Sequence, residues 1–208
     1  MRVTFSGVRY VFVGLMLFLP LLGAHQAHNA VCALAAVEGM IGGGREILAA
    51  DIVQQGFAEV SVPGRLEVMR TSPTVIVDVA HNPAGAAALA AAIGDAFTFD
   101  RLVGVVGVLD DKDASGILAA LEPILSEVVV TQSHSPRALD PRRLGDLATE
   151  IFGAGRVVVE PSLPEALSRA VTSAEDEGAV GGVGVLVTGS VTVVGDARTL
   201  LAGEPTID

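Results

Sequence analysis

The group of side chains best suited to chemistry follows an apolar run, at residues 78–82. Asp78, His81 and Asn82 supply a carboxylate, an imidazole and an amide, and Pro83 then opens an alanine-rich segment. The apolar run at 75–79 predicts a buried strand, and Asn82 followed by Pro83 predicts the start of a helix. Open α/β sheets bind anionic ligands at such junctions, because unpaired helix N–H groups and the helix dipole point there. We therefore predict an anion-facing site around Asp78 and His81.

Two further loops carry polar side chains after apolar runs. Gly189 lets the backbone approach a ligand closely, and Ser190 either donates a hydrogen bond to a substrate carboxylate or only caps the next helix. The acidic turn at 110–113 either holds an ion or is the solvated start of a helix. The glycines at 42–44 lack the Lys and Ser/Thr of a phosphate-binding P-loop, and no metal-ligand spacing stands out. We therefore predict no metal site in this chain.

Strands and helices alternate in the part of the chain that must position these loops. This spacing predicts βαβ units in a doubly wound, mostly parallel α/β sheet flanked by helices. The expected strands are 66–69, 74–79, 102–109, 127–131, 156–159 and 183–188, and the expected helices are 83–96, 114–121, 141–151, 164–174 and 190–201.

Composition excludes several classes of protein. The chain has 208 residues, half of them apolar and 4% aromatic, which favours helices packed closely on a parallel sheet and argues against disorder. A net charge of −11 argues against nucleic-acid binding, which needs a basic face. A single cysteine, Cys32, excludes an internal disulfide and favours a reducing, cytoplasmic location. Because Cys32 lies among apolar residues, we expect a buried thiol.

The first 62 residues pose a separate question. The apolar run at 10–22 resembles a secretory signal, but it is shorter than the roughly 20 residues that span a bilayer, and a buried strand ending in a turn is favoured. We expect a loop at 23–29, in which Asn29 is either a cap or a functional side chain. Helices are expected at 30–41 and 46–55. The Val-Pro-Gly turn at 62–64 predicts a boundary between domains 1–62 and 63–208.

Six short motifs together resemble folylpolyglutamate synthase / dihydrofolate synthase, members of the Mur ligase superfamily. The resemblance extends from about residue 20 to nearly the end of the chain. It corresponds to the end of the family's central domain and its complete Rossmann-like carboxyl-terminal domain. In order, the motifs are Leu-Gly-Ala-His-Gln-Ala-His-Asn-Ala at 22–30, Val-Pro-Gly-Arg-Leu-Glu at 62–67, Asp-Val-Ala-His-Asn-Pro at 78–83, Leu-Asp-Asp-Lys-Asp at 109–113, Ser-Pro-Arg-Ala at 135–138 and Thr-Gly-Ser at 188–190.

The resemblance implies an ATP- and Mg²⁺-dependent amide ligase. In this family ATP phosphorylates a pteroate or folate carboxylate, and the amino group of L-glutamate attacks the acyl phosphate. By resemblance, Asn29 and Arg65 are expected to bind ATP, and Asp78 is expected to contact its ribose. His81 and Ser190 are expected to help place glutamate or the phosphate, with His81 and Arg65 as the catalytic candidates. Arg137 is expected to contact a substrate carboxylate.

The sequence also departs from this family. The family's P-loop, magnesium ligands and modified lysine belong to an amino-terminal half that has no counterpart here. We therefore expect a carboxyl-terminal portion that is inactive alone and works with a separately encoded amino-terminal half, without nucleic acid or membrane. Alternatives are a non-catalytic nucleotide- or glutamate-binding α/β module, a fragment of a Mur-type peptidoglycan ligase, and a secreted or anchored domain.

Overall fold

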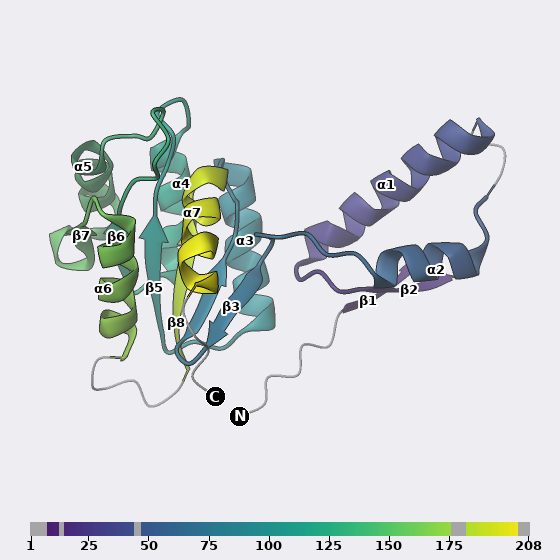
Figure 1. The fold of residues 1–208 in the computed structure, drawn as a ribbon, viewed down its shortest axis with the longest axis horizontal. Helices are drawn as coiled ribbons and strands as arrows, with labels where there is room; N and C mark the ends of the chain where they lie inside the picture. The colour runs from purple at the N-terminus through teal and green to yellow at the C-terminus, as the bar shows by residue number, and fades with distance from the viewer. Residues whose placement is uncertain (1–7, 13–14, 44–46, 176–181, 204–208) are drawn as a thin grey trace. The chain divides into compact units, whose positions relative to one another are not determined.

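A computed structural model of the chain describes residues 8–12, 15–43, 47–175 and 182–203 (Figure 1). The chain divides into two compact units, residues 1–63 and residues 64–208. No helix in the described ranges is both long enough and apolar enough to cross a membrane.

The first unit contains a β-hairpin and two helices. Strands β1 (Val8–Phe12) and β2 (Leu15–Leu19) pair antiparallel, so the apolar run expected to form one strand contributes to two. Helix α1 (Ala24–Gly42) begins six residues before its predicted start. Its N-cap is Gly23, at φ 99°, with no side-chain capping bond to mark the start in the sequence. The prediction of a loop at 23–29 is therefore wrong, because α1 includes residues 24–29.

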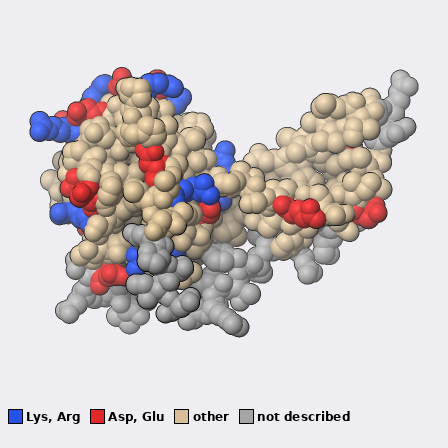
Figure 2. All heavy atoms as spheres, in the orientation of Figure 1, with Lys and Arg blue, Asp and Glu red and all other residues tan. Residues whose placement is uncertain are grey.

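The second helix of this unit, α2 (Ala50–Ala58), begins later than predicted. Residue 46, the expected start, lies outside the described residues, and 47–49 are not helical. Many apolar side chains of the unit are exposed, and the face shown in Figure 2 has few charges over α1 and α2. The expectation of a buried Cys32 thiol is wrong, because Cys32 lies on an exposed side of α1. The large exposed apolar residues of α1, of α2 and of the segment between them are Val31, Val37, Met40, Ile41, Ile47 and Ile52.

The second unit is built on a six-stranded sheet in the order β3-β4-β8-β5-β6-β7. Only the β3–β4 pair is antiparallel in this sheet, and the other four pairs are parallel. The predicted doubly wound, mostly parallel α/β fold is confirmed. The strands are β3 (Glu67–Thr71), β4 (Thr74–Val77), β5 (Arg101–Val106), β6 (Glu127–Val130), β7 (Val157–Val159) and β8 (Val183–Thr188).

Helices cover both faces of this sheet. Figure 1 shows α6 and α7 in front of the sheet and α3 and α4 behind it. Fully buried valines such as Val103 and Val185 pack with α6 and α7 in the core of the front face, as the β-branched composition of parallel strands requires. The helices are α3 (Pro83–Ala96), α4 (Ala114–Leu121), α5 (Pro141–Phe152), α6 (Leu163–Glu175) and α7 (Val191–Ala202), with 3-10 turns at Glu122–Ile124 and Ala154–Arg156.

The carboxyl ends of four neighbouring strands, β4, β8, β5 and β6, share one edge of the sheet. Every motif that the sequence places in the second unit, apart from the 64–67 turn, follows one of these strands. The parallel order therefore gathers their loops into one row.

Candidate functional site

Backbone hydrogen bonds join the loops along this edge. Gly189 N donates to Ala80 O at 3.1 Å, and Gly107 N donates to Thr188 O at 3.1 Å. Gly189 has φ 106°, and a Cβ at this position would lie 2.8 Å from Gly107 O. A side chain at 189 would therefore separate the loops after β8 and β5, which explains the glycine between Thr188 and Ser190.

Asp78 is buried, with 7% of its surface exposed, and its carboxylate accepts two backbone hydrogen bonds. Oδ2 accepts from Leu66 N at 2.9 Å, and Oδ1 accepts from Ala80 N at 2.8 Å. A buried carboxylate is tolerated where such donors surround it. Asp78 therefore ties the turn at 64–66 to the loop after β4.

The same turn is held from a second side and presents Arg65. Gly64 N donates to Glu67 Oε2 at 2.6 Å, and Arg198 of α7 binds both oxygens of that carboxylate, at 2.8 and 3.2 Å. Gly64 and Leu66 both have positive φ, 74° and 45°. Leu66 is the only non-glycine residue of the described ranges with positive φ, a conformation that costs free energy and persists where neighbouring contacts enforce it. The exposed Arg65 side chain therefore projects from a fixed turn.

His81 stands at the amino end of α3 with a fixed ring. Its Nδ1 lies 2.9 Å from Val79 O, and because a carbonyl only accepts, Nδ1 carries the hydrogen. In the neutral ring, Nε2 is then the acceptor. Asn82 caps the helix by accepting from Gly85 N at 2.8 Å, as predicted. The contacts of His81 and Asn82 fix the strand-to-helix junction in the expected form.

Ser190 caps α7 and is 1% exposed. Its Oγ accepts from Val193 N at 3.1 Å, so Ser190 caps the helix, which was one of the two roles expected of it. A hydroxyl that accepts at its oxygen keeps its own hydrogen for a further acceptor, and Thr192 Oγ1 lies 3.2 Å away. Thr188, two residues earlier, is fully buried, and its Oγ1 has no hydrogen-bond partner within the described part of the chain.

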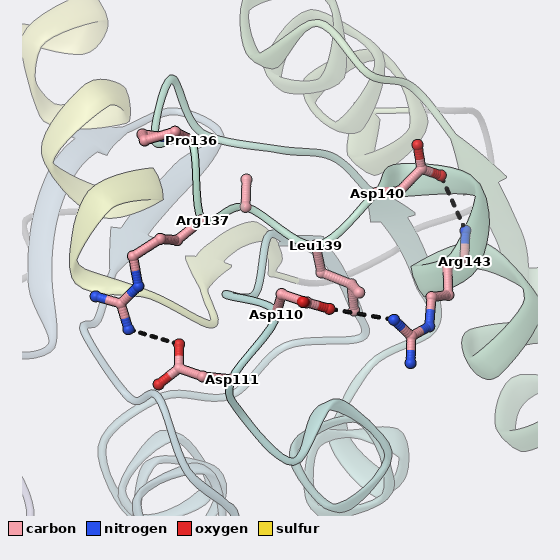
Figure 3. A pocket seen from close by; sticks show the side chains of 8 residues that line it. Asp110, Asp111, Pro136, Arg137, Leu139, Asp140 and Arg143 are labelled. Atoms are coloured by element: carbon pink, nitrogen blue, oxygen red, sulfur yellow. Dashed lines mark hydrogen bonds and ion pairs between the residues drawn. The ribbon is translucent and has the colours of Figure 1, made fainter.

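Arg137 lines a pocket of about 450 Å³ beyond β5 and β6. Figure 3 shows Arg137 and Arg143 pointing to Asp111 and Asp110, with N–O distances of 2.7 and 3.1 Å. Backbone contacts close the pocket wall, because Leu109 and Ala138 form a β-bridge and Asp110 N donates to Arg137 O at 2.9 Å. The Arg137 side chain is 64% exposed, so its ion pair is open to exchange with a ligand.

Neighbouring cations alter the pKa of one carboxyl group that lines this pocket. The hydrogen bond from Lys112, and then the hydrogen bond and charge of Arg137, lower the pKa of Asp111 below its ordinary value. Asp111 thus stays ionised as a partner for Arg137 in mildly acidic solution.

Asn29, the remaining site candidate, lies in the first unit. Its side-chain amide donates to Gln26 Oε1 at 3.0 Å, one turn earlier in α1, so it is not the cap of that helix. Nothing in the described ranges brings three or more His, Cys, Asp or Glu side chains together in a way that could hold a metal ion.

The structure thus links the predicted residues of the second unit through neighbouring loops at one sheet edge. The turn of Arg65 is bonded to Asp78, and the loops that carry His81 and Ser190 are bonded to each other. Sequence reasoning missed the clamp of Glu67 and Arg198, the Arg143–Asp110 pair, and the contacts of Ser133, His134, Thr192 and Asp196 described below. Their partners are up to 131 residues apart in the sequence, which leaves no local signal.

Comparisons with known proteins agree with this architecture. Residues 64–191 match the family described as Mur ligase, glutamate ligase domain. A dihydrofolate synthase/folylpolyglutamate synthase of Mycobacterium tuberculosis is 50% identical over 198 residues, which cover 91% of this chain and 41% of that protein. A crystal structure of the M. tuberculosis folylpolyglutamate synthase complexed with ADP and AMPPCP aligns with a TM-score of 0.85 and 47% identity, over 96% of this chain and 48% of that one.

A more distant structure shows the same fold. Escherichia coli FolC in complex with DHPP and ADP aligns with a TM-score of 0.75 and 26% identity, over 97% of this chain and 45% of that one. The chain thus spans less than half the length of each of these relatives. Since the family match extends over more than half of its residues, the chain belongs to the Mur ligase family and carries that family's glutamate ligase domain at residues 64–191.

Proposed function

We propose that the chain supplies the carboxyl-terminal part of an ATP- and Mg²⁺-dependent ligase that adds L-glutamate to dihydropteroate or to folates. The observation that carries the proposal is the row of loops after β4, β8, β5 and β6. These loops carry His81, Ser190 and Arg137 along one sheet edge, and Asp78 binds the turn that bears Arg65 to the same row. The relatives that share this fold are dihydrofolate and folylpolyglutamate synthases, and solved structures of them contain ADP.

The reaction that we propose has two steps. ATP transfers its terminal phosphoryl group to the carboxylate of the folate, which forms an acyl phosphate and ADP. The amino group of glutamate then attacks the acyl carbon, phosphate leaves, and the nitrogen loses a proton. Both steps develop negative charge on phosphate oxygens, and fixed cations and hydrogen-bond donors stabilise that charge best when they need not reorganise.

Arg65 and His81 are the catalytic candidates. The clamped turn at 64–67 suits Arg65 to a fixed contact with phosphate oxygens, because its backbone is held by Asp78 and Glu67. The neutral His81 ring offers Nε2 as an acceptor, which suits an N–H of the attacking glutamate, whereas the doubly protonated ring suits a phosphate oxygen.

The remaining candidate residues are proposed to bind the substrates or ATP. Ser190 can donate its hydroxyl hydrogen to a carboxylate, and Arg137 can exchange Asp111 for a substrate carboxylate in the 450 Å³ pocket. The main role proposed for Asp78 is to hold the turn that bears Arg65. A contact between Asp78 and the ribose of ATP would use a further lone pair of the same carboxylate. We propose that Asn29 contacts ATP from the first unit, and that the magnesium ligands lie in the part of the relatives that the match does not cover.

The first unit is proposed to be a part of the central ATP-binding domain. Its exposed apolar residues on α1 and α2, such as Met40 at 88% and Ile52 at 60%, give it a surface suited to packing against further protein. In this proposal the part of the ligase that corresponds to the unmatched portion of the relatives packs against that surface.

A fusion protein tests the proposal. The chain is joined to the portion of the M. tuberculosis relative that lies outside the match, and ADP formation is measured with dihydropteroate or folate. We expect ADP to form in the presence of both L-glutamate and the pterin substrate, and His81→Gln to lower the rate at least about tenfold. Asp95→Asn, at an exposed position of α3, serves as the matched control. A folded fusion that binds ATP in calorimetry and forms no glutamate-dependent ADP would contradict the proposal.

A further inference from the structure

Two separate contacts fasten the loop at 131–140, which we name the Arg137 loop, to the first turns of α7. Ser133 Oγ lies 2.9 Å from Thr192 Oγ1. One residue later, His134 N donates to Asp196 Oδ2 at 3.0 Å, and His134 Nδ1 lies 2.5 Å from Asp196 Oδ1. Backbone and side chain of His134 thus share one carboxylate, so the loop is attached to α7 at consecutive residues.

Thr192 also reaches the amino end of the same helix. Its Oγ1 lies 3.2 Å from Ser190 Oγ, so the hydroxyls of Ser190, Thr192 and Ser133 form a continuous chain. Ser190 and Ser133 are buried, at 1% and 8% exposure. Removal of the middle hydroxyl would leave the buried Ser133 hydroxyl without this partner, which favours movement of the loop toward water.

The far end of the Arg137 loop is attached to a different element. Ala138 forms a bridge with Leu109, and Leu139 N donates to Val108 O at 2.9 Å. Arg137 therefore stands between an attachment to α7 and an attachment to the segment after β5. Both attachments contribute to where Arg137 lies relative to Ser190: Ser190 is the N-cap of α7, and Asp110 N donates to Arg137 O on the other side.

We propose that Thr192 and Asp196 are positioning residues that hold Arg137 and Ser190 at a fixed separation, so that the two side chains together select glutamate by its length. This inference rests on the proposed function for its ligand, whereas the attachment of the loop does not. Glutamate carries two carboxylates whose separation is set by two methylenes, and aspartate is one methylene shorter. Two rigidly spaced carboxylate contacts distinguish these acids, and two loosely spaced contacts do so poorly.

Hydrogen exchange on the full chain tests the attachment independently of activity. The variants are Thr192→Val, which removes the shared hydroxyl at nearly constant volume, and Asp196→Ala, which removes the acceptor of His134. We expect exchange at the Arg137 and Ala138 amides to accelerate about fivefold in each, with β8 amides unchanged. Thr192→Ser should restore the parent rates. Thr172→Val is the matched control, because the Thr172 hydroxyl bonds only within α6, to Ser168 O. Unchanged loop exchange in both test variants overturns the inference.

The fusion ligase tests the selection of glutamate. Thr192→Val and Asp196→Ala should raise KM for glutamate about tenfold and leave kcat within about twofold, and the preference for glutamate over aspartate should fall by a similar factor. Thr192→Ser and Thr172→Val should behave like the parent. A loosened loop with unchanged KM and selectivity in an active fusion overturns the positioning role. If the parent fusion is inactive with glutamate, the proposed function fails, and the exchange data alone decide whether the loop is fastened.

Discussion

The loops after β4 and β8 and the loops after β5 and β6 use their polar side chains in opposite ways. Asp78 and Ser190, on the first pair, are buried and bonded to backbone N–H groups. Arg137, on the second pair, and Arg143, in the first turn of α5 that follows it, are 64% and 70% exposed and bonded to exposed aspartates. The first arrangement fixes the backbone around the site, and the second leaves charged groups that can change partners. The edge thus has one rigid side and one exchangeable side.

Asp78→Asn should produce the largest loss of stability at this edge. The new amide would place its NH₂ group against a backbone N–H, and the buried charge that binds Leu66 N and Ala80 N would be lost. We expect the free energy of unfolding of the second unit to fall by about 3 kcal/mol. Hydrogen exchange of the β8 amides measures this loss of stability, and Asp95→Asn, at an exposed position, is the control. Equal exchange in the two variants would show that Asp78 does not hold the turn.

Ser190→Ala should have a smaller effect of the same kind. It removes the hydroxyl that accepts from Val193 N, and loss of a helix N-cap costs about 1 kcal/mol. Ser168→Ala replaces an exposed serine inside α6, where alanine favours the helix, so that variant should lose nothing. If the free energy of unfolding of Ser190→Ala equals that of Ser168→Ala, the Ser190 hydroxyl does not stabilise the start of α7. The backbone alone would then fix the helix start.

Arg137→Gln should weaken glutamate binding while leaving the stability of the fold nearly unchanged. An exposed ion pair contributes at most about 1 kcal/mol, so thermal unfolding should change little. In the fusion ligase, loss of a charge-assisted bond to the glutamate carboxylate should raise KM for glutamate roughly tenfold or more. Arg142→Gln is the matched control, because Arg142 is exposed and does not line the pocket. A KM equal to that of the control would assign Arg137 to the surface rather than to the site.

Local chemistry made the helix starts on both sides of this comparison partly predictable. Asn82 with Pro83, and Asp113 before Ala114, are capping residues that the sequence displays, and α3 and α4 begin and end where predicted. The start of α1 was missed because Gly23 caps it without a side-chain bond. The positive φ of Leu66 was equally hidden, since leucine has no preference for that region and only the Asp78 and Glu67 contacts enforce it.

The candidate site divides in the same way. Asp78, His81 and Ser190 were found because each follows an apolar strand directly in the sequence. The partners that hold the site, Arg198 for Glu67 and Asp196 for His134, come from α7 and meet their acceptors or donors through tertiary packing. Sequence spacing cannot report such pairs, since it records the order of residues and not which faces of the sheet and helices meet.

The smallest expected effect is on the titration of Asp111, and it distinguishes the two cations that contact this carboxylate, Lys112 and Arg137. The folded-state pKa of Asp111 is lowered, so its ion pairs favour the folded state above the ordinary pKa, and this contribution is lost as the pH falls through the lowered value. By NMR titration, Lys112→Met should raise the pKa of Asp111 more than Arg137→Gln does, because the Lys112 hydrogen bond is the larger cause. The reverse order would mean that Arg137 holds Asp111 more tightly than its exposure implies, and a tightly held Arg137 would be poorly placed to exchange Asp111 for a substrate carboxylate.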